Sequence, residues 1–206
     1  MGEHSRPPTC HHQAMYTIAL TLALAAPPGF TEVKSEAGCT LFRGPTEADG
    51  VAPMRAECHW PEVAPEALIT MLGDYAGYDE AIFAITRCEP LRVDGERTLV
   101  HQVQTTRGIA TREVLLWMQT SEADGATIVA WSAATGEPLE LAEGNVRAPR
   151  NEGAWEIAAH PDGGSRVVHR IAYDPGGSVP SWVVRQFSVN GMLQVMAEVR
   201  AKAASP

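Results

Sequence analysis

The stretch YDPGGSVPSW, residues 173–182, decides how the C-terminal part of the chain is organised. Before it stands RVVHRIAY, residues 166–173, whose β-branched residues predict a strand. After it comes a long segment over residues 180–203 without internal proline, which predicts a helix. Two adjacent glycines and a proline lie between them, more than a tight turn needs. The stretch therefore predicts a strand, a flexible loop and a helix in that order.

The C-terminal helix is predicted to be apolar on two sides. Gly191 separates the two sets of apolar residues and marks the point where the helix could bend. The sets are Trp182, Val183 and Phe187, then Met192, Val195, Met196 and Val199. A helix of this kind can face different parts of one concave sheet.

The middle of the chain predicts an antiparallel meander after one short helix. The helix begins near Pro65 and ends at Gly73. Six β-rich stretches follow between residues 80 and 173, and turn sequences such as DGE, EADG and PDGG separate them. Antiparallel strands joined by short turns need this pattern, so the chain is expected to fold as one α+β domain.

Composition and charge exclude some classes of partner. Of the 206 residues, 45% are hydrophobic, which is enough for a core. The formal net charge is −9 and no basic run occurs, so neither nucleic acid nor an anionic membrane surface is expected as a lasting partner. Contact with a membrane is expected to be transient at most.

The N-terminal segment has the pattern of a secretory signal. Residues 15–26, MYTIALTLALAA, have the length of a signal-peptide apolar region, and ALA at 23–25 offers small residues for cleavage. We therefore expect residues 1–25 to be a signal peptide, residues 26–37 a linker, and the mature protein to be periplasmic or secreted. The alternative is an N-terminal helix in a cytoplasmic protein.

The cysteines are consistent with export. Cys39 and Cys58 flank two alternating runs, and a two-residue turn at Ala48 and Asp49 would place them opposite each other. A disulfide in that register would stabilise the fold by about 3 kcal/mol. The alternative is two reduced cysteines in a cytosolic protein. Cys88 would remain a single thiol.

Four short motifs resemble the START domain, the lipid-binding branch of the Bet v 1-like (SRPBCC) helix-grip superfamily. TREV at 111–114 resembles its Arg-Asp strand motif, with Glu113 in the acidic place. VR at 146–147 and GAW at 153–155 resemble its Val-Arg and Gly-x-Trp signatures. YDPGGSVPSW resembles the run that opens its last helix. The resemblance covers residues 38–203.

This resemblance implies a curved antiparallel sheet that grips the C-terminal helix, with an apolar tunnel between them. Gly176 and Gly177 would form one lip of the tunnel mouth and act as a gate, or they would simply form a left-handed turn. Family members that bind sterols often carry a buried acid–base pair in the tunnel. The aligned positions here are Gln102 and Met118, so that ion pair is absent.

The candidate ligand-binding residues follow from strand alternation and side-chain size. If Arg112 faces the tunnel, alternation brings three apolar neighbours to the same face and turns Trp117 to the opposite one. On the last strand His169 and Tyr173 could donate hydrogen bonds to a ligand or be satisfied within the core. Trp155 is expected to be structural. The candidates are Gln102, Arg112, Val114, Leu116, Met118, Trp131, His169, Ile171, Tyr173, Gly176, Gly177 and Trp182.

No motif for catalysis, metal binding or nucleotide binding occurs, so no catalytic residue, metal or cofactor is predicted. The favoured function is to bind one hydrophobic ligand, such as a lipid, sterol or isoprenoid, for transport or sequestration. One alternative is an enzyme of the polyketide cyclase or aromatase kind that uses Arg112, His169 and Tyr173. Another is an interaction module whose own side chains fill the cavity.

Overall fold

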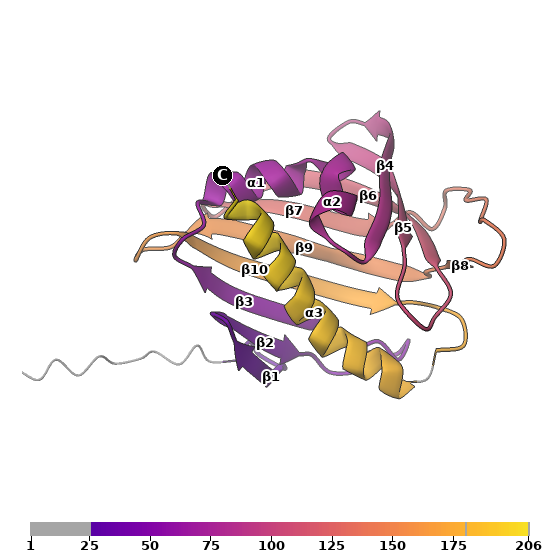
Figure 1. Cartoon of the computed structure of the whole chain (residues 1–206), viewed down its shortest axis with the longest axis horizontal. Coiled ribbons are helices and arrows are strands. Elements are labelled where there is room, and N and C mark those ends of the chain that lie inside the picture. The colour runs from indigo at the N-terminus through magenta and orange to yellow at the C-terminus, as the bar shows by residue number, and fades with distance from the viewer. Residues whose placement is uncertain (1–25, 180, 206) are drawn as a thin grey trace, which may run out of the picture.

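The computed structural model describes residues 26–179 and 181–205, and for residues 181–187 it describes the backbone alone. Its fold is α+β and helix-grip, as predicted: a large antiparallel sheet is crossed by the C-terminal helix (Figure 1). The strands are β1 (Thr31–Glu36), β2 (Cys39–Arg43), β3 (Met54–Trp60), β4 (Ile85–Asp94), β5 (Arg97–Gln104), β6 (Arg112–Ala123), β7 (Ala126–Ala133), β8 (Val146–Arg147), β9 (Arg150–Ala159) and β10 (Ser165–Asp174). The helices are α1 (Pro65–Gly73), the 3₁₀ turn η1 (Tyr75–Gly77), α2 (Tyr78–Ala81) and α3 (Ser181–Ala203).

The strand order is β1-β2-β3-β10-β9-β7-β6-β5-β4, and β8 pairs in parallel with β6 away from this path. The last strand therefore lies between the N-terminal hairpin and the meander. Helix α3 runs diagonally across one face of the sheet, while α1 and α2 lie beside the same face (Figure 1). Residues of β10 that point toward α3 are consequently at the centre of the fold.

The N-terminal hairpin confirms the predicted register. Cys39 lies opposite Cys58 across β2 and β3, and their sulfur atoms form a disulfide. The predicted two-residue turn is wrong, because β2 ends at Arg43 and β3 begins at Met54. The loop between them is closed by the Gly44 N–H, which donates to the carbonyl oxygen of Pro53 at 2.8 Å.

The linker predicted over residues 26–37 is in part a strand. Residues Thr31–Glu36 form β1 and pair with β2, although every residue of β1 is exposed. A strand that buries neither face shows no apolar alternation, so no pattern in the sequence indicates it. The predicted signal peptide, residues 1–25, lies outside the described residues.

The two predicted helices are both present. Pro65 is at the start of α1, where a backbone N–H would have no acceptor within the helix, so its absence costs nothing. Leu68 and Leu72 of this helix are buried. In α3 the predicted stripe packs inward, with Met192, Met196 and Val199 at most 5% exposed.

A second, smaller core lies on the opposite face of the sheet. It contains Leu99, Leu115 and Ala134, with Trp117 packed against it, as alternation predicted for Trp117. Glu113 is buried beneath this core and is fully partnered: it accepts from His101 at 2.8 Å, from the Ala142 N–H and from Asn145. Burial opposes its ionisation, but these hydrogen bonds outweigh burial and hold the pKa of Glu113 below its ordinary value.

Candidate functional site: the cavity beneath the C-terminal helix

A cavity of about 620 Å³ lies between the sheet and α3. Its volume is in the range typical of small-molecule sites, about 300–1,000 Å³. Most of its wall is apolar, and Arg112 is the one arginine, lysine or carboxylate among the described residues that line it. Eight of the predicted ligand-binding residues line this cavity: Gln102, Arg112, Leu116, Met118, Trp131, His169, Ile171 and Tyr173.

The other four predicted residues are not part of the described lining. Val114 has the predicted orientation, but it is buried within the core and does not reach the open space. Gly176 and Gly177 belong to the loop beside the cavity, whose Pro175 and Val179 do line it. The Trp182 side chain lies outside the described residues.

A chain of polar side chains crosses the wall from β10 to β4. The Tyr173 hydroxyl donates to Oε1 of Gln104 at 2.9 Å, and the Gln104 amide donates to Oε1 of Gln102 at 3.1 Å. Gln102 in turn donates to Sγ of Cys88 at 3.4 Å. Burial raises the pKa of Tyr173 to about 12 and that of Cys88 to about 11, so both stay protonated at neutral pH.

An aromatic group built around His169 forms the centre of the wall. The imidazole stacks on Trp155 with ring centroids 3.8 Å apart, and it lies 5.7 Å from the ring of Trp131. The Trp131 indole N–H donates to Oδ1 of Asn151 at 2.8 Å. A Cβ on Gly153 would lie 2.5 Å from Cζ2 of Trp131, so the indole can cross β9 only because residue 153 has no side chain.

His169 is uncharged at physiological pH. Its side chain is 4% exposed, and this burial lowers its pKa to about 3, although a backbone hydrogen bond at Ala154 acts in the opposite direction. Its Nδ1 atom is buried without a hydrogen-bond partner. Of the two possibilities left open for His169, a fully satisfied core histidine does not describe this nitrogen.

Arg112 fastens the loop that leads into α3. Its Nε donates to the carbonyl oxygen of Pro175 and its Nη2 to that of Gly176, both at 3.1 Å, and its Nη1 donates to Ala110. All of these acceptors are backbone carbonyls. Gly176 and Gly177 have φ values of +64° and +67°, which glycine adopts without the strain that other residues incur.

Several residues that line the cavity are also partly exposed. They include Phe83 before β4, Thr106 and Ile109 between β5 and β6, and Val179 in the loop before α3. Phe83 is 61% exposed, although it is a large apolar residue.

Several lining residues were missed or misjudged from sequence. Trp155 was expected to be structural, but it lines the cavity together with Asn151 and Gln104. Strand alternation could have found them, since Asn151 and Trp155 share a face of β9, and Gln104 shares a face of β5 with Gln102.

The described part of the chain offers no site of another kind. Within it, no three His, Cys, Asp or Glu side chains are grouped so that they could hold a metal ion. None of the described helices combines the length and apolar character needed to cross a membrane.

The sequence profile of the START domain matches residues 19–204. The chain belongs to the START domain family. The match extends beyond the predicted boundaries of 38–203 and begins inside the predicted signal segment. Any function proposed for this protein must therefore use a START fold with a cavity beneath its last helix.

Individual relatives are distant. The uncharacterized protein PA1579 of Pseudomonas aeruginosa is 25% identical over 95 residues, which are 46% of this chain and 47% of that protein, so the match spans about half the length of this relative. The STAR-related lipid transfer protein of Xanthomonas axonopodis is 21% identical with a TM-score of 0.76, over 86% of this chain and 99% of that one.

A START-fold enzyme is also similar. The Zhui aromatase/cyclase from Streptomyces sp. R1128 is 11% identical with a TM-score of 0.52, over 73% of this chain and 93% of the enzyme. At these identities the structural likeness establishes the fold alone.

Proposed function

We propose that this START protein binds one hydrophobic ligand, such as a lipid, sterol or isoprenoid, in the cavity beneath α3 and transports or sequesters it. The observation that carries the proposal is a largely apolar cavity of about 620 Å³ in which Arg112 supplies the one guanidinium among the described lining residues, and its N–H groups bond backbone carbonyls. Burial of apolar ligand surface contributes about 25 cal/mol per Å², so shape can supply most of the affinity. The similarity to a lipid transfer protein supports this reading.

The open cavity disagrees with the interaction-module hypothesis, in which the protein's own side chains fill this space. The Cys39–Cys58 disulfide supports an oxidising compartment, and so a periplasmic or secreted protein. The loop at Gly176 and Gly177 is proposed as the gate through which the ligand passes, because it borders the cavity next to Pro175 and Val179.

The test is native mass spectrometry of the protein purified from its source. We expect a co-purifying lipid-sized mass that organic extraction removes. Ile171→Trp should abolish this mass, because Ile171 lines the cavity and a larger side chain would occupy the ligand's volume. Arg170→Trp is the matched control: it is the neighbouring position on β10, is exposed on the opposite face and should keep the mass. A cavity that never yields or takes up a lipid would contradict the proposal.

The second candidate is a cyclase or aromatase reaction in the same cavity. The similarity to the Zhui enzyme and the presence of Arg112, His169 and Tyr173 in one cavity favour it. Arg112 and Tyr173 already bond protein acceptors, however, so neither side chain is poised to act on a substrate. For a carrier, His169→Phe or Tyr173→Phe should change ligand affinity by about 1 kcal/mol. A reproducible turnover that either variant abolishes would favour the enzyme.

A further inference from the structure

Two neighbouring residues of β6 reach opposite faces of the sheet. Arg112 lines the cavity and bonds the carbonyl groups of Pro175 and Gly176. Glu113 points to the outer face and is only 3% exposed. A buried carboxylate is costly unless it is well hydrogen-bonded, so the partners of Glu113 indicate its role.

Two of these partners lie in the segment that follows β7, residues 142–149. Oε1 of Glu113 accepts the Ala142 N–H at 2.9 Å and the Asn145 side-chain amide at 2.5 Å, and these two residues close a turn. Oε2 accepts Nε2–H of His101 at 2.8 Å. Hydrogen bonds to an ionised carboxylate are stronger than those between neutral groups. Glu113 therefore fixes the start of the segment 142–149 to β6.

His101 is held so that it can only donate to Glu113. Nη2 of Arg87 lies 2.7 Å from Nδ1 of His101, and a guanidinium has no acceptor, so Nδ1 must accept. Nε2 then carries the proton and donates to the carboxylate. All three groups that bond Glu113 are consequently donors, an arrangement that a carboxylate satisfies and a neutral amide does not.

A very short strand extends this attachment toward the loop before α3. Where β7 ends, β8 takes its place beside β6, and Glu113 lies opposite Arg147 in this parallel pair. Because β8 has two residues, its backbone contributes few hydrogen bonds, and the Arg147 side chain adds bonds to two carbonyl groups of the preceding loop. The bonds of Glu113 are thus a large share of what holds β8 in place.

The loop before α3 packs on this segment. We call residues 174–179 the gate loop; it lies at the same end of the sheet as β8 (Figure 1). A Cβ on Gly176 would lie 2.8 Å from Cδ of Pro149 and 3.0 Å from the Arg147 carbonyl oxygen. One on Gly177 would lie 3.5 Å from Cγ1 of Val146. A displacement of the segment 142–149 would therefore remove the surface on which the gate loop rests.

We propose that Glu113 is a positioning residue of the gate loop: from the outer face of the sheet it fixes the segment 142–149, on which Gly176 and Gly177 pack, and so limits ligand exchange without contacting the ligand. This inference rests on the proposed function, in which that loop is the gate. Arg112 holds the loop directly, and Glu113 holds the support beneath it.

Glu113→Gln breaks this support with little change in shape. Its amide has one accepting oxygen, so its NH₂ group must face at least one of the three donors. Two quantities are measured: hydrogen exchange in peptides that cover residues 174–179, and release of pyrene-labelled decanol to phosphatidylcholine vesicles. We expect both to be about fivefold faster, the effect of one net hydrogen bond. Exchange in β2 and β3 should stay close to the wild-type rate.

Ser165→Ala is the matched control. It also removes a buried side-chain hydrogen bond, from Ser165 to the carbonyl oxygen of Val63 at 2.7 Å, but it does so at the opposite end of β10 from the gate loop. It should leave both rates unchanged. Glu113→Asp keeps the charge and should release the probe more slowly than Glu113→Gln. If Glu113→Gln does not fold, Asn145→Ala is used, which removes one of the three bonds and should act in the same direction.

The outcomes separate this inference from the proposed function. Unchanged hydrogen exchange of the gate loop in folded Glu113→Gln would overturn the inference while the proposed function stands. Equal acceleration in Ser165→Ala would overturn it too, because lost stability alone would explain the effect. Faster exchange of the loop with unchanged release would show that the loop moves without controlling the ligand, which also overturns it. A wild-type protein that never takes up the probe would instead contradict the proposed function.

Discussion

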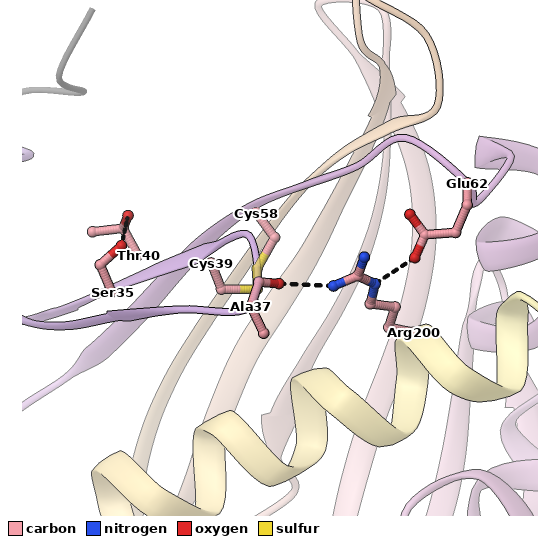
Figure 2. Close-up of a disulfide and its surroundings, with 7 residues drawn as sticks. All are labelled: Ser35, Ala37, Cys39, Thr40, Cys58, Glu62 and Arg200. Atoms are coloured by element: carbon pink, nitrogen blue, oxygen red, sulfur yellow. Dashed lines mark hydrogen bonds and ion pairs between the residues drawn. A yellow bond between two sulfur atoms is a disulfide. The ribbon is translucent and has the colours of Figure 1, made fainter. Parts of the chain in front are cut away.

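The two ends of α3 are held to the sheet in different ways. Near the C-terminal end, Nε of Arg200 bonds Oε1 of Glu62 at 2.6 Å and its Nη1 bonds the carbonyl oxygen of Ala37 at 2.8 Å, beside the Cys39–Cys58 disulfide (Figure 2). At the other end, the loop before the helix is held by Arg112 through the carbonyl groups of Pro175 and Gly176.

This difference suggests which end opens. The C-terminal end is linked to two loops from distant parts of the sequence, and one of them precedes a strand held by a covalent bond. The other end depends on hydrogen bonds to a loop whose Gly177 and Ser178 are exposed. Segments with few buried contacts open at the lowest free-energy cost. We therefore expect ligand exchange at the loop end, with the disulfide end as the fixed point.

The largest expected effect comes from the fixed end. Replacing Cys39 and Cys58 by Ser should lower the free energy of unfolding by about 3 kcal/mol, because the bridge closes a loop with a sequence separation of 19 residues in the unfolded chain. Urea denaturation measures this loss, and the affinity for a fluorescent lipid should change little. Cys88→Ala is the control for loss of a buried sulfur without a cross-link. A double variant no less stable than Cys88→Ala would contradict the comparison.

A decrease in pH should destabilise the cavity wall around His169 more than the disulfide end of the molecule. Native His169 has a pKa of about 3, whereas an unfolded histidine titrates near about 6.5. Between these two pH values the unfolded state binds more protons than the native state. The stabilisation that comes from keeping His169 neutral is therefore complete above about pH 6.5, and it decreases as the pH falls. Lowering the pH from 7 to 5 should therefore reduce the free energy of unfolding by on the order of 2 kcal/mol through His169 alone.

His169→Phe isolates this effect from the titration of carboxylates. Urea midpoints of the wild type and the variant are compared at both pH values, and the variant should lose less stability on acidification. Hydrogen exchange at pH 5 should rise in β10 before it rises in β2 and β3. Identical pH dependence of the two proteins would show that His169 does not titrate as its burial requires.

The smallest expected effect tests the loop itself. Gly177→Ala introduces a Cβ at a positive φ and should cost about 1 kcal/mol of stability, but the nearest atom, Cγ1 of Val146, is 3.5 Å away, so no clash results. Gly176→Ala is less informative, because its Cβ would lie 2.8 Å from Cδ of Pro149. If the loop is a gate, Gly177→Ala should slow release of a pyrene-labelled decanol to vesicles several-fold, with a smaller change in equilibrium affinity.

Gly95→Ala controls for strain alone. Gly95 has a φ of +61° and lies in the turn between β4 and β5, where a Cβ would meet no atom within 4 Å. It should lose similar stability and leave the release rate unchanged. Lost stability without slower release in Gly177→Ala would reduce the loop to a left-handed connector between β10 and α3.

The sequence predicted the elements that depend on local pattern. The assumed turn at Ala48 and Asp49 placed Cys39 opposite Cys58 although the turn itself was wrong, because the longer observed loop is centred on the same two residues and keeps the same pairing. Alternation placed Met118 and His169 on the cavity side. Alternation assigns a face of a strand, however, and does not say whether that part of the face is covered, which is why Val114 is buried in the core instead.

The parts of the site that remained hidden depend on contacts between distant strands. The Trp131–His169–Trp155 group exists because Gly153 lets an indole cross one strand to reach the next. The unpartnered state of Nδ1 is a property of all its neighbours at once. Neither follows from the spacing of residues within any single strand.

The sheet is open, and its border strand β4 has features that oppose the addition of another chain. Within the described part of the chain β1 and β4 end the sheet, and β4 exposes Leu91 and Val93. Its ladder is interrupted by two bulges, and Pro90 lacks the N–H that an added strand would need. Border strands interrupted in this way are poor templates for edge-to-edge aggregation. The protein can thus have a wide sheet with free edges around its cavity and still have a low tendency to form fibres.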